Sequence, residues 1–138
     1  MLTPIAVMQA LSPAMIAREW GRVVCITSQS VKAPVPQLGL SNAAGTAGQV
    51  AGRGVTLYKL LPGIHATDRA DALDAGVVKA QGTPLEQARI QRCAGIPVGH
   101  YGTPAEFGAA AAFLCSQYAG FTVGQNIVLD GAATNATI

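Results

Sequence analysis

The sequence is poor in charged and aromatic residues, and this shortage excludes several classes of protein. Charged residues make up 12% of the 138 residues and aromatic residues 5%, whereas 50% are hydrophobic. The nine basic residues are scattered from Arg18 to Arg92 and the net charge is only +2, so we expect no nucleic-acid partner. The apolar fraction suffices for a packed core and excludes a disordered chain. The length predicts one domain at most.

Long apolar runs and cysteine motifs are also missing. We find no run of about 18 apolar residues, so we expect no membrane-spanning helix. The N-terminus lacks the pattern of a signal peptide. The cysteines (Cys25, Cys93 and Cys115) and the two histidines have no spacing typical of metal ligands. We therefore expect buried thiols, no metal site and a reducing, cytoplasmic setting.

Helical and strand patterns alternate along the chain, which predicts an α/β fold. Short apolar runs at about 22–27, 54–60 and 125–129 are typical of strands in a parallel sheet, the first of them buried on both faces. The helices expected between them cover residues 3–20, 38–50, 67–93 and 103–115. This order predicts about three parallel strands with helices packed on both faces.

Two tetrapeptides share the signature of a helix start. Residues 83–86 read TPLE and residues 103–106 read TPAE, with a glutamate three positions after each threonine. This is the spacing of a capping box, in which the two side chains satisfy free amide groups at the helix start. We predict that both tetrapeptides cap a helix in this way. In the first helix, we expect Thr3 to act as the cap and Gly21 as the stop.

Several segments of the chain resemble one enzyme family. Residues 21–28 read GRVVCITS and are similar to a strand that ends at a catalytic serine, here Ser28. Residues 61–67 read LPGIHAT and are similar to a Pro-Gly segment. A C-terminal signature is similar to residues 101–107 (YGTPAEF), 112–116 (AFLCS) and 124–131 (GQNIVLDG). In this order, they resemble the C-terminal half of a short-chain dehydrogenase/reductase, most closely the 3-oxoacyl carrier-protein reductases.

The resemblance implies a Rossmann-like fold and an NAD(P)-dependent oxidoreductase that acts on a small carbonyl or alcohol. It gives Ser28 the role of orienting the carbonyl oxygen. It assigns the nicotinamide carboxamide to the segment that contains Pro62, Gly63, Ile64 and Thr67. The cofactor implied is NAD or NADP, and the residue that would distinguish them lies in the half of the family fold that this sequence does not match.

The sequence departs from the family at the residues that transfer the proton. The family's Tyr-x-x-x-Lys position reads LGLSN, so that Leu38 replaces the tyrosine and Asn42 the lysine. Leucine cannot transfer a proton, and asparagine carries no charge that would lower a pKa. The family's glycine-rich pyrophosphate turn is expected upstream of Met1. We therefore expect one truncated domain over 1–138 that lacks the dinucleotide-binding half. We expect its chemistry to be impaired, and cofactor binding is left open.

Two alternative catalytic arrangements remain open. Tyr58 and Lys59 could form a replacement acid/base pair, although neighbouring side chains on a strand point apart. Ser41 lies in a segment similar to a nucleophile elbow, which would make the chain a serine hydrolase. That reaction would need a histidine base and an orienting aspartate, with the candidates His65, His100, Asp68 and Asp130.

A non-catalytic binding or oligomerisation module is the other hypothesis. If the family's first four strands are absent, the strand at 22–27 becomes an open edge of the sheet. Open edges and uncovered apolar surfaces are templates for pairing with another chain. We therefore expect a homo-oligomer, either a dimer or a tetramer.

Overall fold

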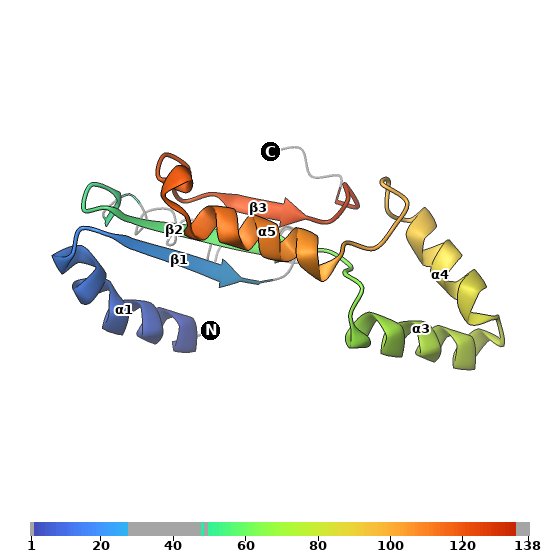
Figure 1. The fold of residues 1–138 in the computed structure, drawn as a ribbon. Helices are drawn as coiled ribbons and strands as arrows, with labels where there is room; N and C mark the ends of the chain where they lie inside the picture. The colour runs from blue at the N-terminus through green and yellow to red at the C-terminus, as the bar shows by residue number, and fades with distance from the viewer. Residues whose placement is uncertain (1, 28–47, 49, 135–138) are drawn as a thin grey trace.

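The structure of the chain, a computed structural model, describes residues 2–27, 48 and 50–134. Its elements follow one another as a helix, two strands, three helices, a 3-10 turn and a last strand (Figure 1). In chain order they are α1 (Leu2–Ala17), β1 (Gly21–Ile26), β2 (Val55–Pro62), α3 (Asp68–Gln81), α4 (Leu85–Ala94), α5 (Pro104–Cys115), η2 (Gln117–Ala119) and β3 (Asn126–Leu129). Of the helix expected at 38–50, only residues 48 and 50 are described, and both are helical.

The strands form one parallel sheet in the order β1-β2-β3, as predicted. The register aligns Val24 with Tyr58 and Leu60 with Ile127. Each strand lies within two residues of its expected position. Pro62 was expected to follow the second strand but is its last residue. A proline is tolerated there because its missing amide would face β1, whose last residue Ile26 pairs with Leu60, whereas the Gly63 amide donates to β3.

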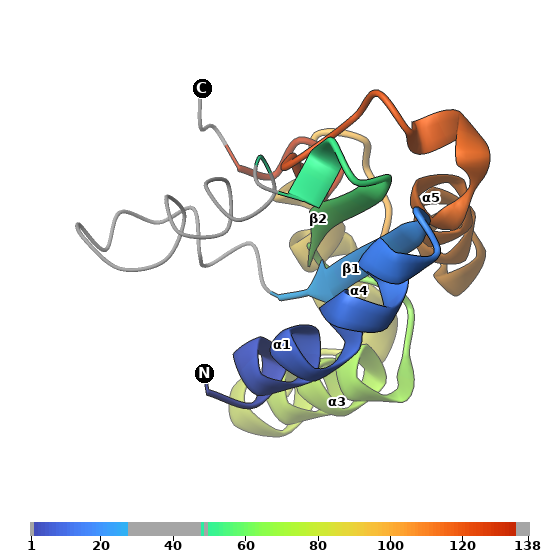
Figure 2. The same ribbon diagram turned by 90° about the vertical axis from the view of Figure 1, so that its left-hand side faces the viewer.

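The core is divided between the two faces of β2. On one face, Val55 and Leu57 pack against α1. On the other, Tyr58 and Leu60 pack against Leu114 of α5. Figure 2 shows α1 and α5 on opposite sides of the strands, so the prediction of helices on both faces is confirmed. Complete burial of a side chain such as Leu60 contributes roughly 1.5–3 kcal/mol to folding.

The prediction that β1 is buried on both faces is wrong. Its interior residues are only half-buried, and Ile26 at its end is 62% exposed. The reason is its position, since β1 pairs with β2 alone in the part of the chain that the structure describes. β1 is therefore the open edge that the sequence suggested, and β2 is the strand enclosed on both faces.

The two Thr-Pro tetrapeptides do not behave alike. At α5 the Thr103 side chain accepts from the Glu106 amide and the Glu106 side chain accepts from the Thr103 amide, so the predicted capping box is confirmed. At α4 the prediction is wrong, because the helix begins one residue later with Pro84 as its N-cap. Thr83 follows directly after Gly82, whose left-handed backbone closes the preceding helix α3. The turn out of α3 therefore determines the backbone of Thr83.

The bounds of α1 also differ from the prediction. The helix already begins at Leu2, so Thr3 is not its cap, and it ends at Ala17 rather than at Gly21. Gly21 is instead the first residue of β1 and is required by packing, because a Cβ there would lie 2.7 Å from the Met15 side chain. In the described part of the chain, no helix is long and apolar enough to cross a membrane.

The cysteines were expected to be buried, and this expectation is wrong. Cys115 is exposed on α5, while Cys25 and Cys93 are half-buried. Cys25 lies on the open-edge strand β1. Cys93 lies in the last turn of α4, whose only buried residue is Ala88. Apolar character alone therefore does not bury these thiols, because each lies on an element with one uncovered side.

Candidate functional site

The candidate site lies at the carboxyl edge of the sheet. Because the strands are parallel, the segments that follow β1, β2 and β3 all emerge at this edge. The segment after β2 contains the predicted residues Gly63, Ile64 and Thr67, and Pro62 ends the strand itself. Beyond this edge α3 and α4 project away from the sheet (Figure 1). Ser28, which follows β1, lies outside the described residues, as do Leu38, Ser41 and Asn42.

The segment after β2 is held by backbone hydrogen bonds on two sides. The Gly63 amide donates to the Leu129 carbonyl at 2.8 Å, which ties the segment to β3. The Gly102 amide donates to the Ile64 carbonyl at 3.0 Å, and the Ala66 amide donates to the Gly102 carbonyl at 2.8 Å. These bonds make a short parallel bridge between His65 and Gly102. The backbone that leads to Thr67 is therefore fixed before α3 begins.

His65 turns its ring towards α5. The ring meets Phe107 edge to face, with 5.3 Å between the ring centroids, and its Nδ1 lies 3.2 Å from the Gly63 carbonyl oxygen. Gly102 provides the space for this ring, because a Cβ at that position would lie 2.7 Å from it. The imidazole therefore serves to pack the bridge against α5.

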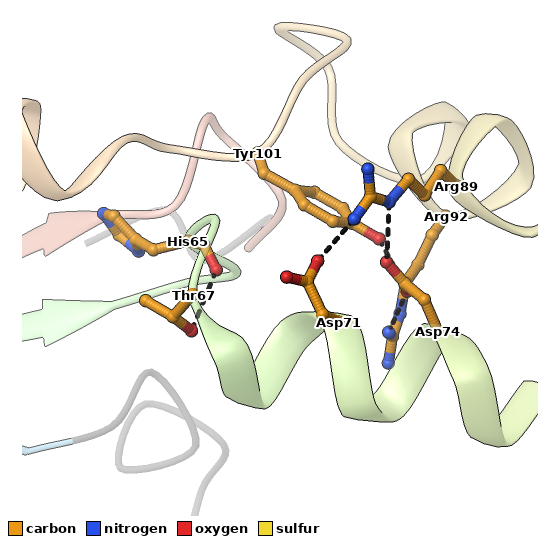
Figure 3. A network of polar contacts seen from close by, with 7 residues as sticks. All are labelled: His65, Thr67, Asp71, Asp74, Arg89, Arg92 and Tyr101. Carbon is orange, nitrogen blue, oxygen red and sulfur yellow. Dashed lines mark hydrogen bonds and ion pairs between the residues drawn. The ribbon is translucent and has the colours of Figure 1, made fainter. Parts of the chain in front are cut away.

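Thr67 lies at the N-cap position of α3, but its side chain makes no capping hydrogen bond. Its backbone has the extended conformation of an N-cap residue, yet its side chain accepts no hydrogen bond from the helix. The hydroxyl, which is exposed, donates to the His65 carbonyl over a long 3.4 Å (Figure 3). Its oxygen can therefore also accept a hydrogen bond from a ligand. Asp68 and Asp71 in the first turn of α3 complement the positive end of the helix dipole.

A buried carboxylate lies farther along α3. The Asp74 side chain is 0% exposed and accepts from the Arg92 guanidinium at 2.6 Å, the Tyr101 hydroxyl at 2.9 Å and Nε of Arg89 at 3.4 Å (Figure 3). Arg89 also forms an ion pair with Asp71. Burial raises the pKa of Asp74, but the hydrogen bonds from Arg92 and Tyr101 outweigh it and leave the pKa below its usual range.

Sequence reasoning missed this Asp74 network, although a signal for it exists. Asp71 and Asp74 are three residues apart on one helix, and Arg89 and Arg92 are three residues apart on the next. Residues at this spacing share one face of a helix. Two acidic residues on one helix and two basic residues on the following helix therefore predict that the helices pair. The participation of Tyr101 has no such signal, because it comes from a loop.

Glu106 carries a second perturbed carboxylate near the edge. Hydrogen bonds from the Thr103 backbone, and then from its side chain, hold the pKa of Glu106 below its usual range, with a smaller contribution from the neighbouring histidines. His100 is exposed and its Nδ1 lies 2.9 Å from the Tyr101 carbonyl oxygen. The Glu106 carboxylate is therefore committed to capping α5.

Tyr58 and Lys59 are not brought together as an acid/base pair. Tyr58 is buried between β2 and α5 and donates its hydroxyl to the Ala119 carbonyl. Lys59 is the next residue of the same strand, so its side chain starts on the opposite face. The proposed pair therefore has no geometric support.

The residues required by a serine hydrolase are also not assembled in the described part of the chain. There, no hydrogen bond joins His65 or His100 to a carboxylate. Asp130 instead accepts from the backbone amides of Ala132 and Thr134, each at 3.0 Å, and so closes the turn after β3. Over the same described residues, no group of three acidic, histidine or cysteine side chains could hold a metal ion.

Comparison with known proteins gives a consistent match. A family model described as enoyl-(acyl carrier protein) reductase matches residues 1–134. The NADPH-dependent reductase BacG of Bacillus subtilis (strain 168) is 32% identical over 131 residues, which cover 88% of this chain and 51% of that protein. The 3-oxoacyl-[acyl-carrier-protein] reductase FabG of Rickettsia typhi is 30% identical over 126 residues, which cover 85% of this chain and 48% of that protein.

Solved structures show the same relationship. The crystal structure of YwfH, described as an NADPH-dependent reductase involved in bacilysin biosynthesis, matches with a TM-score of 0.83 and 28% identity. The match covers 96% of this chain and 54% of that one. The fold is therefore the Rossmann-like one that the resemblance implied. The chain spans about half the length of the relatives that it matches.

Proposed function

The chain belongs to the short-chain dehydrogenase/reductase family, and we propose that it contributes the nicotinamide- and substrate-facing side of an NAD(P)-dependent oxidoreductase site. The observation that carries this proposal is the edge segment that ends at Thr67. It follows the central strand, is fixed by bonds to Leu129 and Gly102, and presents a hydroxyl that does not cap its own helix. Ligands of open α/β sheets bind at this edge, beyond the carboxyl ends of the strands.

The edge segment fits the carboxamide end of a nicotinamide nucleotide. A carboxamide both donates and accepts hydrogen bonds, and the Thr67 hydroxyl can do the same. The backbone of Pro62, Gly63 and Ile64 would hold the same group beside it. When bound, the cofactor would supply or accept a hydride. A diphosphate fits the start of α3 poorly, since Asp68 and Asp71 in its first turn would repel it.

The proposal includes impaired chemistry. Hydride transfer to a carbonyl needs a proton donor, and Leu38 and Asn42 stand where the family has its tyrosine and lysine. The Tyr58 hydroxyl lies on the α5 face of β2 and already donates to Ala119, so it offers no replacement. We expect a small carbonyl or alcohol ligand to bind near Ser28, with turnover slow or absent.

Calorimetric titration of the purified chain with NADPH, and then with NADH, tests the proposal. NADPH comes first because the relative BacG is named as NADPH-dependent. We expect saturable binding in the micromolar range, and Thr67→Ala should weaken it about tenfold, which is the loss of one hydrogen bond. Thr122→Ala, on the loop before β3, is the matched control and should bind as the wild type does. A folded sample that gives no heat at about millimolar cofactor would overturn the proposal.

A homo-oligomeric assembly module is the second candidate, favoured by the uncovered apolar surface. Phe121 is fully exposed, Tyr118 is 80% exposed, and Ile26 lies on the open-edge strand β1. Such surfaces usually mark contacts with another chain. We propose a dimer or tetramer, which light scattering at micromolar concentration would detect. A monomer at that concentration would contradict this proposal and leave the first unaffected.

A further inference from the structure

Helices α3 and α4, with the residues that join them to the sheet edge, form an arm over residues 67–101, and the two helices themselves enclose almost no apolar side chains. The buried residues of α3 are Ala70 and Asp74, and α4 buries only Ala88. The larger apolar side chains Leu73 and Ile90 of these helices are about half or more exposed. The buried Ile96 follows α4 and lies close to Gly131, after β3. The polar contacts of Asp74 are therefore the main specific contacts between the two helices in this part of the chain.

We propose that Asp74 is a positioning residue for the nicotinamide-facing edge, acting through α3 to fix the direction in which Thr67 points. Asp74 follows Thr67 by seven residues, which is two helical turns, so both lie on one side of α3. This inference rests on the function proposed for the edge segment.

The contacts of Asp74 close a ring of bonded segments, and Thr67 is one member of that ring. Tyr101, which donates to Asp74, is followed directly by Gly102. Gly102 is hydrogen-bonded to Ile64 and Ala66, and Ala66 directly precedes Thr67. The ring thus runs from Thr67 along α3 to Asp74, across to Tyr101, and back through the bridge (Figure 3). One side of the ring is a helix, so breaking the Asp74 contact leaves α3 free to pivot about Thr67.

A carboxylate suits this position because it only accepts hydrogen bonds, and the polar groups that contact it are all hydrogen-bond donors. Arg89, Arg92 and Tyr101 approach it from the other helix and from the loop. An asparagine has nearly the same shape, but its NH2 group would meet one of these donors and its charge is lost. Asp74→Asn therefore removes the restraint without leaving a cavity. Tyr101→Phe removes only the link from α3 to the bridge.

Amide hydrogen exchange on the full chain tests whether Asp74 restrains the arm. In Asp74→Asn we expect the amides of α3 and α4 to exchange about tenfold faster, while those of β2 keep the wild-type rate, because local opening does not expose the sheet core. Tyr101→Phe should accelerate α3 alone. Glu86→Gln, an exposed acid-to-amide change on α4, and Tyr118→Phe are the matched controls. If Asp74→Asn accelerates exchange in β2 as much as in α3, Asp74 stabilises the whole fold. If it leaves the rates of α3 unchanged, Asp74 does not restrain the arm. Either result overturns the proposal.

A second measurement separates this proposal from that of cofactor binding. If the wild type binds NADPH, Tyr101→Phe should raise the dissociation constant several-fold at an unchanged melting temperature, and an unchanged constant overturns the positioning role. If the wild type does not bind NADPH, the proposed function fails. The inference about Asp74 then depends on the two bonded amides on either side of Thr67. These are Ala66, which donates to Gly102, and Asp71, which donates to the Thr67 carbonyl, and both must lose protection in both variants.

Discussion

The sheet and the α3–α4 arm are stabilised in opposite ways. In the sheet, β2 is enclosed between α1 and α5, and its stability comes from buried apolar side chains such as Leu60. In the arm, the enclosed side chain of greatest consequence is the charged Asp74. Apolar burial involves no titrating group and is not screened by salt, whereas charged contacts depend on pH and weaken as salt screens them. The two regions therefore respond to different perturbations, although backbone bonds hold them together at the bridge between His65 and Gly102 and between the Val98 amide and the Gly131 carbonyl.

The largest effect is expected in the sheet. Leu60→Ala removes a fully buried side chain from between β2 and α5 and should lower the free energy of unfolding by about 2–5 kcal/mol. Chemical denaturation followed by circular dichroism measures the loss. Leu85→Ala, at the exposed start of α4, should cost less than about 1 kcal/mol. If the two variants lose similar amounts of unfolding free energy, the apolar core is not the main source of stability in the sheet.

A double-mutant cycle tests the arm. Asp74→Asn and Arg92→Gln, alone and combined, should give a coupling energy of about 1–3 kcal/mol, because Asp74 is enclosed and Arg92 is mostly covered. The cycle on Asp71 and Arg89 is the matched control, since both side chains are about half-exposed. Its coupling should stay below about 1 kcal/mol and fall with added salt. Equal couplings would contradict the distinction between the enclosed pair and the exposed pair.

Acid should loosen the arm before the sheet. The pKa of Asp74 is lowered in the folded chain, so the unfolded chain binds its proton first as the pH falls. The stabilising contribution is therefore complete above the usual aspartate pKa and is lost as the pH falls through the folded value. We expect the protection of amides in α3 and α4, measured relative to their intrinsic exchange rates, to fall over this range, by less than in Asp74→Asn. Asp74→Asn should show no such acid-dependent step, and a step that remains in this variant must come from another group.

The sheet could be predicted from the sequence better than the arm, for a physical reason. In the sequence, strand β2 can be recognised as an apolar run, and α5 as a helical pattern that places Phe107 and Leu114 on one face. These local patterns follow from burial in a core. The arm lacks such a core, so its helices could be recognised while the Asp74 contact between them was missed. Burial of β1 also failed as a prediction, since it depends on which strands lie beside it.

The candidate site was predicted in part. The resemblance assigned the nicotinamide carboxamide to the Pro-Gly segment, and the structure has Pro62 as the last residue of the central strand with Gly63 directly after it. The binding itself stays a prediction. The use of Gly102 to bridge that segment, and of Tyr101 to hold α3, could not be foreseen, because both depend on contacts between segments about 27 to 38 residues apart. The roles of Ser28 and Ser41 stay predictions, since both lie outside the described residues.

The smallest effects are expected at the two Thr-Pro tetrapeptides. There the sheet and the arm are compared through single hydroxyl groups, those of Thr103 and Thr83. Thr103 caps α5, so Thr103→Ala should lower the free energy of unfolding by about 1 kcal/mol. Thr83 is half-buried at the turn of the arm, and its buried hydroxyl has no hydrogen-bond partner. Thr83→Val keeps the shape of the side chain and removes the unsatisfied group, so it should be neutral or stabilising by up to about 1 kcal/mol. Thermal unfolding of the two variants measures both effects. A destabilised Thr83→Val variant would mean that this hydroxyl has a partner after all, and that the arm depends on polar contacts beyond those of Asp74.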